Sequence, residues 1–258
     1  MSESLLCSSD SQTLRCARIG DVALGEGPVK VFSSLMPTKA EELRVLAQRY
    51  RALGADVFEW RADHQNDLTV QNVVLAAEGL EGICPQPLLF TIRTAHEGGL
   101  FAGDDALYAE LIETALTQTA VKAVDIEVER SVAARLVQAA HEAGKPAVMS
   151  YHDFSGTPYQ GEVLARFARM HAMGGDVLKM AVMPQSEEDV LDFMSAVLRA
   201  RRLFDVPILA MSMGSLGRAS RVCGTLFGSC ATFASLEESS APGQMAVADV
   251  RRTLVLLG

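Results

Sequence analysis

The sequence predicts an α/β fold, a single (β/α)8 TIM barrel that occupies residues 1–258. Eight short apolar runs recur along the chain, and an amphipathic helix pattern follows most of them. Most runs are continuous rather than alternating, which is typical of parallel strands that are covered on both faces. A length of 258 residues is also usual for one such barrel. Because neither a linker nor any repeat beyond the strand–helix unit divides the chain, we expect one domain.

Each strand is expected in one apolar run. The runs are VKVFSSLM at 29–36, DVFEWRAD at 56–63, PLLFTIRT at 87–94, VKAVDIEV at 121–128, KPAVMSYHD at 145–153, DVLKMAV at 176–182, VPILAMSM at 206–213 and CATFASLE at 230–237. The segment at 14–27 precedes them and is expected to form a β-hairpin, with a turn near Gly20 and Asp21, that closes the bottom of the barrel. The Ser-rich residues 1–12 are expected to be flexible.

Helix patterns lie between the strands and carry end signals. The first helix is expected to start at Thr38, with Glu41 three residues on completing a capping box. The fourth helix runs from Ser131 to a stop at Gly144, and the sixth is capped by Ser186. The segment after the seventh strand gives the weakest helix, because glycines interrupt it. An open doubly wound sheet is the competing architecture, but no GxGxxG motif follows the first strand to support a dinucleotide site.

Composition and charge exclude several classes of protein. The chain carries 23 Lys and Arg against 32 Asp and Glu, a net charge of −9, so we expect no nucleic-acid and no anionic-membrane partner. The five cysteines are odd in number and form no CxxC or Cys/His cluster, which indicates reduced thiols in a cytoplasmic protein rather than a disulfide frame or a zinc site. The chain also lacks the pattern of a signal peptide and any apolar stretch long enough for a transmembrane helix.

Polar side chains gather near the ends of the expected strands, where barrels carry their catalytic groups. The most informative residue is Lys179, which lies in the apolar run VLKMAVM with no acidic residue within two positions on either side. Desolvation there disfavours the ammonium form and lowers the lysine pKa, so the amine could attack a carbonyl and form an imine. The alternative is a strand lysine that reaches the rim of the barrel or pairs with Glu127.

Two more side chains and one loop complete the candidate catalytic groups. His152 ends the fifth strand, beside the strand of Lys179, and an imidazole titrates near neutral pH. Glu97 follows the third strand and could orient that imidazole. The alternatives are a histidine that caps loop backbone and a solvated loop carboxylate. The segment EESSAPGQ at 237–244 could act as a lid over the site or be an ordinary loop.

Four arginines could recognise an anion, because a guanidinium binds both oxygens of a carboxylate. Arg61 and Arg93 end strands inside the barrel mouth, which favours binding over a surface position. Their alternative is an internal salt bridge, for instance between Arg61 and Glu59. For Arg218 and Arg221, the residues alone favour a surface position.

Seven segments occur in an order and spacing that fit one barrel: EWRAD at 59–63, TIRTAHEGG at 91–99, SYHD at 150–153, LKMAVMP at 178–184, MSMGSLGRASR at 211–221, FGSCATF at 227–233 and SSAPGQ at 239–244. Together they resemble the type I 3-dehydroquinate dehydratase family, from about Val29 to the C-terminus. The resemblance implies a TIM barrel that uses no metal and no organic cofactor, and it implies a homodimer.

The resemblance also implies a role for each matching residue. Lys179 forms the imine, His152 transfers protons, and Glu97 supports the histidine. The implied substrate-binding residues are Glu59, Arg61 and Arg93 for ring hydroxyls, Arg221, Ser240 and Gln244 for a carboxylate, and Ser34, Met211, Met213, Phe233 and Ala241 for the pocket wall. Gly217, Arg218 and His96 depart from the family pattern. The resemblance therefore does not fix the conformation of the loop before Arg221 or the surroundings of Glu97.

The implied reaction is the dehydration of 3-dehydroquinate to 3-dehydroshikimate, a step of the shikimate pathway. An iminium at Lys179 is the electron sink, and His152 removes one proton and returns one to the departing hydroxyl. Two alternatives remain. A class I aldolase shares the barrel and the lysine but predicts a phosphate site at strands seven and eight. A non-catalytic barrel used as a binding module has no need for Lys179.

Overall fold

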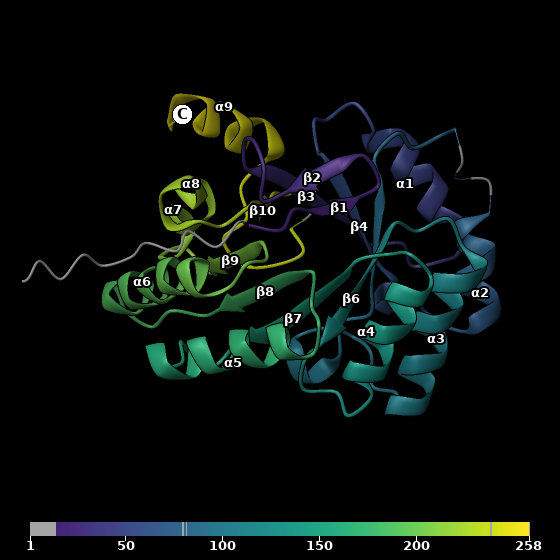
Figure 1. The fold of residues 1–258 in the computed structure, drawn as a ribbon. Coiled ribbons are helices and arrows are strands. Elements are labelled where there is room, and N and C mark those ends of the chain that lie inside the picture. Colours follow the sequence, from purple (N-terminus) through teal and green to yellow (C-terminus); the bar gives the residue numbers. More distant parts are fainter. Residues whose placement is uncertain (1–13, 79, 81, 238, 258) are drawn as a thin grey trace, which may run out of the picture.

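The computed structural model describes residues 14–78, 80, 82–237 and 239–257, and it shows a barrel of parallel strands surrounded by helices (Figure 1). The strands are adjacent in the order β10-β3-β4-β5-β6-β7-β8-β9. Each lies within the run that predicts it, and their bounds are β3 (Lys30–Leu35), β4 (Val57–Arg61), β5 (Leu88–Thr91), β6 (Ala123–Glu127), β7 (Ala147–Asp153), β8 (Val177–Val182), β9 (Ile208–Ser212) and β10 (Ala231–Phe233). The predicted (β/α)8 fold is confirmed.

The barrel closes between β9 and β10, which stand at the two ends of the strand order. Ile208 of β9 forms a parallel bridge with Ser229, just before β10, and the Cys230 amide donates to the Ile208 carbonyl at 2.7 Å. This bridge is isolated, whereas the other neighbouring strands of the barrel pair over two or more residues.

Helices alternate with the strands and cover the outside of the barrel (Figure 1). The sixth helix begins as predicted, since the Ser186 side chain accepts a hydrogen bond from the Asp189 amide. In place of the weak helix expected after the seventh strand, the chain forms two short helices, α7 and α8. The helices are α1 (Glu42–Tyr50), α2 (Val70–Ala77), α3 (Asp105–Gln118), α4 (Ala133–Glu142), α5 (Gln160–Ala172), α6 (Glu187–Leu203), α7 (Arg218–Val222), α8 (Gly224–Phe227) and α9 (Val247–Leu257), with 3-10 turns η1 (Ala62–His64) and η2 (Ala95–Glu97).

The predicted start of the first helix is wrong. The helix α1 begins at Glu42, and the Glu41 side chain makes no capping hydrogen bond. Instead, Glu42 Oε2 accepts from the Thr38 amide and hydroxyl, both at 2.8 Å, and from the Lys39 amide at 3.2 Å. A carboxylate four residues on therefore satisfies the loop backbone, because residues 37–41 turn before the helix begins.

The N-terminal hairpin closes the bottom of the barrel, as predicted. Strands β1 (Ala17–Ile19) and β2 (Val22–Leu24) pair antiparallel around Gly20, whose φ of +61° is readily accessible to glycine. Ile19 and Leu24 are fully buried against the apolar side chains at the amino ends of the barrel strands. The expectation that residues 1–12 are flexible lies outside the described residues.

The inside of the barrel changes from apolar to polar along the strands. The lowest layer of inward side chains is apolar: Phe32, Val57, Leu89, Ala123, Val148, Val177, Leu209 and Ala231. Two residues further along, the next layer includes Ser34, Glu59, Thr91, Asp125, Ser150 and Lys179. Since side chains two apart share a strand face, these six strands each carry a polar group directly above an apolar one, whereas β9 and β10 carry Met211 and Phe233. This arrangement puts a polar site at the carboxyl ends of the strands.

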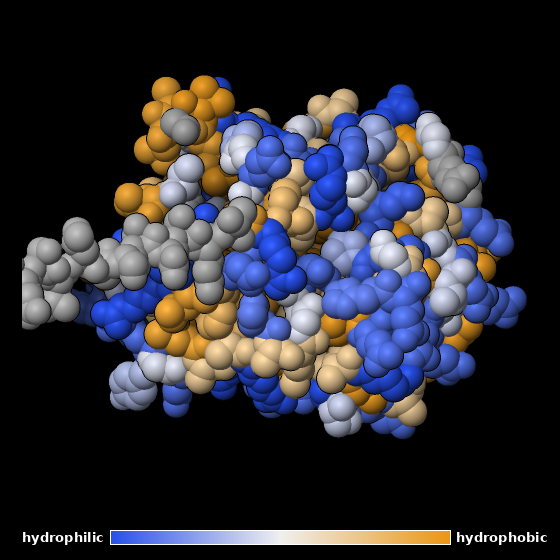
Figure 2. Space-filling view, in the orientation of Figure 1, coloured by the Kyte–Doolittle hydropathy of each residue, from blue (hydrophilic) through white to orange (hydrophobic). Residues whose placement is uncertain are grey.

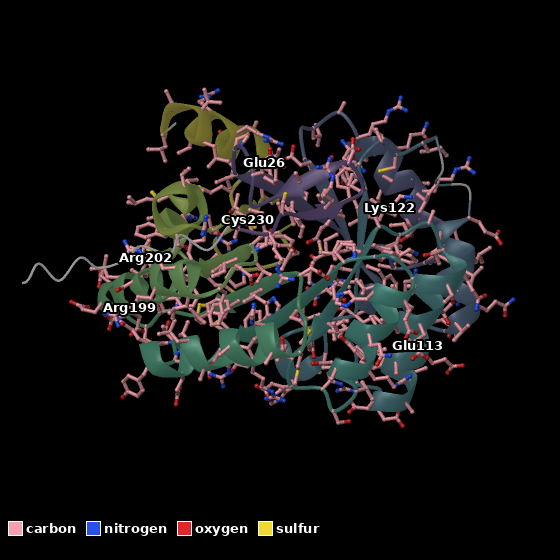
Figure 3. All side chains as sticks on the ribbon, in the orientation of Figure 1. Glu26, Glu113, Lys122, Arg199, Arg202 and Cys230 are labelled. Atoms are coloured by element: carbon pink, nitrogen blue, oxygen red, sulfur yellow. The ribbon has the colours of Figure 1, made fainter. Side chains whose placement is uncertain are left out.

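The outer surface is mainly polar, with charged side chains such as Arg199 and Arg202 pointing away from α6 (Figure 3). Hydrophobic side chains gather at the end of α9, at the upper left of Figure 2. There Val255 and Leu256 are 81% and 79% exposed. Within the described part of the chain, no helix is long and apolar enough to cross a membrane.

Candidate active site

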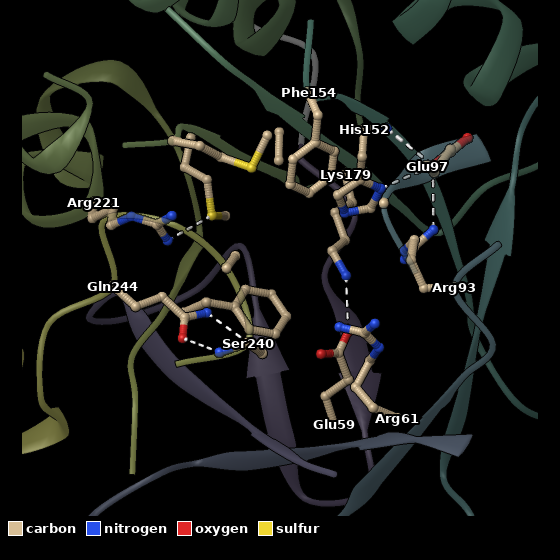
Figure 4. Close-up of a pocket in the computed structure, with 16 residues that line it drawn as sticks. Glu59, Arg61, Arg93, Glu97, His152, Phe154, Lys179, Arg221, Ser240 and Gln244 are labelled. Atoms are coloured by element: carbon tan, nitrogen blue, oxygen red, sulfur yellow. Dashed lines mark hydrogen bonds and ion pairs between the residues drawn. The ribbon is translucent and has the colours of Figure 1, made fainter. Parts of the chain in front are cut away.

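A pocket of about 490 Å³, including space open to solvent, lies at the carboxyl ends of the strands (Figure 4). It contains 13 of the 14 side chains that the sequence predicted for the site: Glu59, Arg61, Arg93, Glu97, His152, Lys179, Met211, Met213, Arg221, Phe233, Ser240, Ala241 and Gln244. Ser34 does not line it but donates to Glu59 Oε2 at 2.6 Å and contacts the Ser240 hydroxyl at 2.9 Å. The predicted residues are therefore brought together.

Lys179 lies on β8 with 3% of its surface exposed. Its Nζ is 3.0 Å from Glu59 Oε1 and 2.9 Å from Asp125 Oδ2, and 4.6 Å from the centre of the Phe233 ring. The predicted isolation of this lysine from acidic groups is therefore wrong in space, although it holds along the chain. The alternative partner, Glu127, is also wrong, because Glu127 bonds to Arg93 and Thr94. Two carboxylates offset the cost of burying the ammonium group.

Both carboxylates beside Lys179 are held as anions. Burial raises the pKa of Glu59, but the charges of Lys179 and Arg61 outweigh it and the pKa is lowered. For Asp125, burial is again outweighed, by Arg93 and Lys179, and the pKa falls to about 2. The lysine therefore faces two fixed negative charges at neutral pH.

His152 and Glu97 form a hydrogen-bonded pair at the mouth. Glu97 Oε2 accepts from the His152 amide at 3.0 Å and lies 2.9 Å from His152 Nδ1. Burial, helped by the charges of Glu127 and Asp125, raises the pKa of Glu97 well above its usual value despite Arg93. Burial and the neighbouring cations lower the pKa of His152 well below 6.5. The neutral imidazole of His152 is therefore favoured at neutral pH, and because Nδ1 is bonded to Glu97, Nε2 is the ring nitrogen left for proton transfer.

Arg61 and Arg93 are committed to carboxylates. Arg61 binds Asp63 through two bonds, of 2.8 and 2.7 Å, so its salt-bridge partner is Asp63 and not Glu59. Arg93 donates to Asp125, Glu127 and Glu97 at 2.8, 2.9 and 3.3 Å. These anions outweigh burial and raise the pKa of Arg93. Both guanidinium groups line the pocket, and each is already bonded to carboxylates of this chain.

Arg221 is a buried cation that forms no ion pair with any residue that the structure describes. It lies on α7 with 1% exposure, so the surface position favoured by its residues alone is wrong. One Nη donates to the Pro242 carbonyl at 2.9 Å, the other contacts Met211 Sδ at 3.3 Å, and Nε has no partner in the described chain. Burial lowers the pKa of Arg221 to about 10. Arg218 is exposed, as expected.

Ser240 and Gln244 lie beside Arg221 on the segment before α9 (Figure 4). Gln244 Nε2 donates to the Ser240 hydroxyl at 2.9 Å, and the Ser240 amide donates to Gln244 Oε1 at 3.0 Å. Arg221, Ser240 and Gln244 together offer guanidinium, hydroxyl and amide donors on one side of the pocket, opposite Lys179 and His152. Such a group suits a carboxylate.

Three pocket residues were missed from the sequence: Gly98, Phe154 and Ala181. Ala181 is two residues after Lys179, so strand alternation could have found it. Gly98 has a φ of +79°, and a Cβ there would come within 2.3 Å of the Phe154 ring. The Gly pair after Glu97 was the available signal for this close contact.

The departures from the family pattern have simple structural outcomes. A Cβ at Gly217 would lie 2.3 Å from the Ser212 carbonyl oxygen, so the chain needs glycine where it turns toward Arg221. His96 is exposed and is not among the groups that shift the pKa of Glu97. In the part of the chain that the structure describes, no three His, Cys, Asp or Glu side chains are placed to hold a metal ion.

One pocket at the carboxyl ends of a parallel barrel holds a buried lysine, a histidine–carboxylate pair and a buried arginine. The fold and this pocket define the class as a TIM-barrel enzyme that acts on a small molecule. A sequence model of the type I 3-dehydroquinase family matches residues 31–258. The chain therefore belongs to the type I 3-dehydroquinase family, whose members are hydro-lyases.

Individual relatives agree with this assignment. The chain is 38% identical over 250 residues to a 3-dehydroquinate dehydratase of Salmonella typhimurium, a match that covers 95% of this chain and 99% of the relative. A crystal structure of 3-dehydroquinate dehydratase from Geobacillus kaustophilus superposes with a TM-score of 0.90 at 33% identity, covering 96% and 98% of the two chains. The type I enzyme from Clostridium difficile, solved with covalently modified comenic acid, gives 0.89 at 32% identity, covering 95% and 98%.

Proposed function

We propose that this protein converts 3-dehydroquinate to 3-dehydroshikimate through an imine at Lys179, as a step of the shikimate pathway. The observation that carries the proposal is one pocket in which a buried lysine amine faces a buried arginine that forms no salt bridge with any described residue. The first suits a ketone and the second a carboxylate, and the proposed substrate has both groups. Membership of the type I 3-dehydroquinase family supports the same reaction over the aldolase alternative.

Imine formation begins with a neutral Lys179 amine. The ammonium first gives a proton to a neighbouring base, and the Nζ lone pair then attacks the substrate carbonyl. The resulting carbinolamine loses water, and the iminium nitrogen draws electrons from the adjacent carbon. The Glu59 and Asp125 carboxylates, at 3.0 and 2.9 Å from Nζ, are placed to stabilise this positive charge.

His152 completes the elimination. A neutral imidazole, which its lowered pKa favours, removes the proton beside the iminium carbon. The electrons of that C–H bond form an enamine, which expels the β-hydroxyl group, and His152 returns the proton to it as water leaves. Hydrolysis of the imine frees the product and the lysine. General acid–base help of this kind contributes roughly 10²–10⁴ in rate.

The remaining pocket residues are proposed to hold the substrate. Arg221, Ser240 and Gln244 bind its carboxylate, and Glu59, Arg61 and Arg93 hold its ring hydroxyls, while Ser34 supports Glu59 and Ser240. Apolar side chains pack against the ring, namely Met211, Met213, Phe233 and Ala241. The covalently modified ligand in the Clostridium difficile relative supports covalent chemistry in the family.

Two measurements test the proposal. Protein mixed with 3-dehydroquinate should generate the enone absorbance of the product. Borohydride added during turnover should inactivate the enzyme and leave a mass adduct on the Lys179 peptide, while Lys179→Met should give neither product nor adduct. An adduct on another residue, or turnover by Lys179→Met, would contradict the assigned role.

We also propose a cytoplasmic homodimer. Free thiols at Cys16, Cys84, Cys223 and Cys230 in the described chain are typical of a reducing compartment. The exposed Val255 and Leu256 of α9 form the kind of apolar surface that a second copy covers. Sedimentation of the purified protein should give twice the mass of one chain, and a monomer at micromolar concentration would contradict the dimer.

A further inference from the structure

Asp125 connects the lysine to the rest of the site without touching the pocket. It is fully buried on β6, and its Oδ2 lies 2.9 Å from Lys179 Nζ. The other oxygen, Oδ1, accepts from Arg93 Nη2 at 2.8 Å and from the Ser150 hydroxyl at 2.6 Å. Arg93 continues through Nη1 to Glu97, which bonds to His152. An unbroken chain of polar contacts therefore joins Nζ to the imidazole.

We propose that Asp125 is a positioning residue for the reaction: a permanent anion that holds Lys179 Nζ in place and, through Arg93, fixes it relative to the His152–Glu97 pair. The inference rests on the proposed imine at Lys179 and adds a residue to it. Asp125 does not itself meet the substrate.

Asp125 and Glu59 differ in what they are free to do. Glu59 lines the pocket, where substrate can compete for its oxygens. Asp125 is not among the side chains that line the pocket, and its two oxygens are occupied by three donors: Arg93, just after β5, Ser150 on β7 and Lys179 on β8. Its pKa of about 2 keeps it charged throughout the working range. Asp125 therefore acts as a fixed charge, and the proton released by Lys179 goes elsewhere.

The anchor is rigid because its parts come from adjacent strands. Asp125 lies on β6, Ser150 on β7 and Lys179 on β8, and Ser150 pairs directly with Lys179 in the strand register. Side chains supported by neighbouring strands hold their geometry better than side chains on loops. The imine nitrogen and the imidazole must act on adjacent carbon atoms, so a fixed separation between them serves catalysis.

The charge of Asp125 also affects when Lys179 can lose its proton. The charged and titratable groups around Nζ and along the pocket come from every side: Glu59 and Arg61 on β4, Arg93 just after β5, Asp125 on β6, Glu97 on η2, His152 on β7 and Arg221 on α7. Only Glu59 and Asp125 bond to the ammonium group within the described chain. Removing the charge of Asp125 leaves one anion, so the ammonium is less stable and the amine is freed at lower pH.

The test is the pH dependence of imine trapping. The initial rate of adduct formation on Lys179, with 3-dehydroquinate and cyanoborohydride, is followed by intact mass from mildly acidic to alkaline pH. In Asp125→Asn, the acid limb of this profile should move about 1–3 pH units lower. Turnover should fall by about tenfold or more while KM changes less than about threefold, because Asp125 does not contact substrate.

Glu127→Gln is the matched control. Glu127 lies two residues along the same strand and binds the same arginine at 2.9 Å, but it does not bond to Lys179. Its acid limb should coincide with that of the unmodified protein. Asp125→Glu keeps the charge but moves it, so it should keep the acid limb while turnover falls. Should Asp125→Asn fail to fold, Asp125→Ser removes the same charge, leaves room for water, and should give the same shift.

The outcomes separate the inference from the proposed function. With no adduct on Lys179 in the unmodified protein, the proposed function itself fails. With a normal adduct there but the same acid limb in the neutral Asp125 variants, Asp125 is only structural and the inference is overturned. Equal shifts in the Asp125 and Glu127 variants also overturn it, because they would place the effect in Arg93.

Discussion

Arg221 gives the sharpest prediction, because its guanidinium is buried and no described carboxylate pairs with it. Only the Pro242 carbonyl and Met211 Sδ contact its Nη atoms, at 2.9 and 3.3 Å, and Nε has no partner among the described residues. Burial without compensation lowers the pKa of this arginine to about 10. A bound carboxylate would supply the missing negative charge, so substrate binding would offset the cost of burying the Arg221 guanidinium.

We predict that Arg221→Lys keeps the fold but weakens the transition-state complex. A lysine retains the charge but loses the forked pair of donors that can hold two carboxylate oxygens. Hydrogen bonds to charged groups contribute about 1.5–3 kcal/mol, so kcat/KM should fall roughly 10- to 150-fold. KM should rise and kcat should fall, because the lost bonds both bind the substrate and orient it toward His152.

Steady-state kinetics on two variants decide the matter. Arg218→Lys is the control, since Arg218 lies on the same short helix but is exposed, and it should change kcat/KM less than about twofold. The midpoint of thermal unfolding should stay within about 2–4 °C for both variants. A neutral Arg221→Lys, or a larger loss for Arg218→Lys, would refute the reasoning that places the carboxylate at Arg221.

Three further predictions follow from the site. In His152→Ala, imine formation should persist while elimination collapses, so a covalent substrate adduct should accumulate in intact-mass spectra; near-normal turnover would remove His152 from the mechanism. Activity should survive EDTA and dialysis, because the described chain has no cluster of metal ligands, and a loss that zinc or magnesium restores would contradict this. Asp125 is more acidic folded than unfolded, so its stabilising effect is present above its ordinary pKa of 3.8 and is lost as the pH falls toward about 2. The free energy of unfolding, measured with urea at each pH over that range, should fall less steeply with pH in Asp125→Asn than in the unmodified protein. Parallel curves would show that Asp125 is not responsible.

Most of the barrel could be predicted because its signal is local. A parallel strand covered on both faces must be apolar over several residues, so each run marks a strand wherever the strand sits in the barrel. Helix ends were less certain. At the first helix, Glu41 and Glu42 both offer a carboxylate, and the choice depends on the path of residues 37–41, which composition does not encode. Ser186 has no such competitor, and its cap was predicted correctly.

The sequence predicted which residues line the candidate site, but it did not predict which of their charged groups form ion pairs. The side chains that face the pocket follow from strand alternation and the family motifs, whereas their partners depend on which strands are neighbours. Lys179 looked isolated because its acidic partners, Glu59 and Asp125, lie 120 and 54 residues away along the chain. Arg221 looked like a surface residue because nothing near it in sequence signals burial.

The wrong predictions for Lys179 and Arg221 have the same physical origin but opposite consequences. In a closed barrel, an inward charge on one strand meets inward groups from strands far away in sequence, so local neighbours say little about its electrostatic partners. For Lys179, these distant groups supply two anions, which offset the cost of burying the ammonium group. The residues next to Lys179 in sequence give no sign of this pairing. For Arg221, the described residues supply no anion, and the cost of burial remains until an anion binds. A buried cation that is paired holds its place in the resting protein, and a buried cation that is unpaired is ready to bind a ligand. The contrast between these two residues therefore supports the proposal that Lys179 is the covalent centre and Arg221 the carboxylate site, on opposite walls of one pocket, and it predicts a single bound orientation for an anionic ketone.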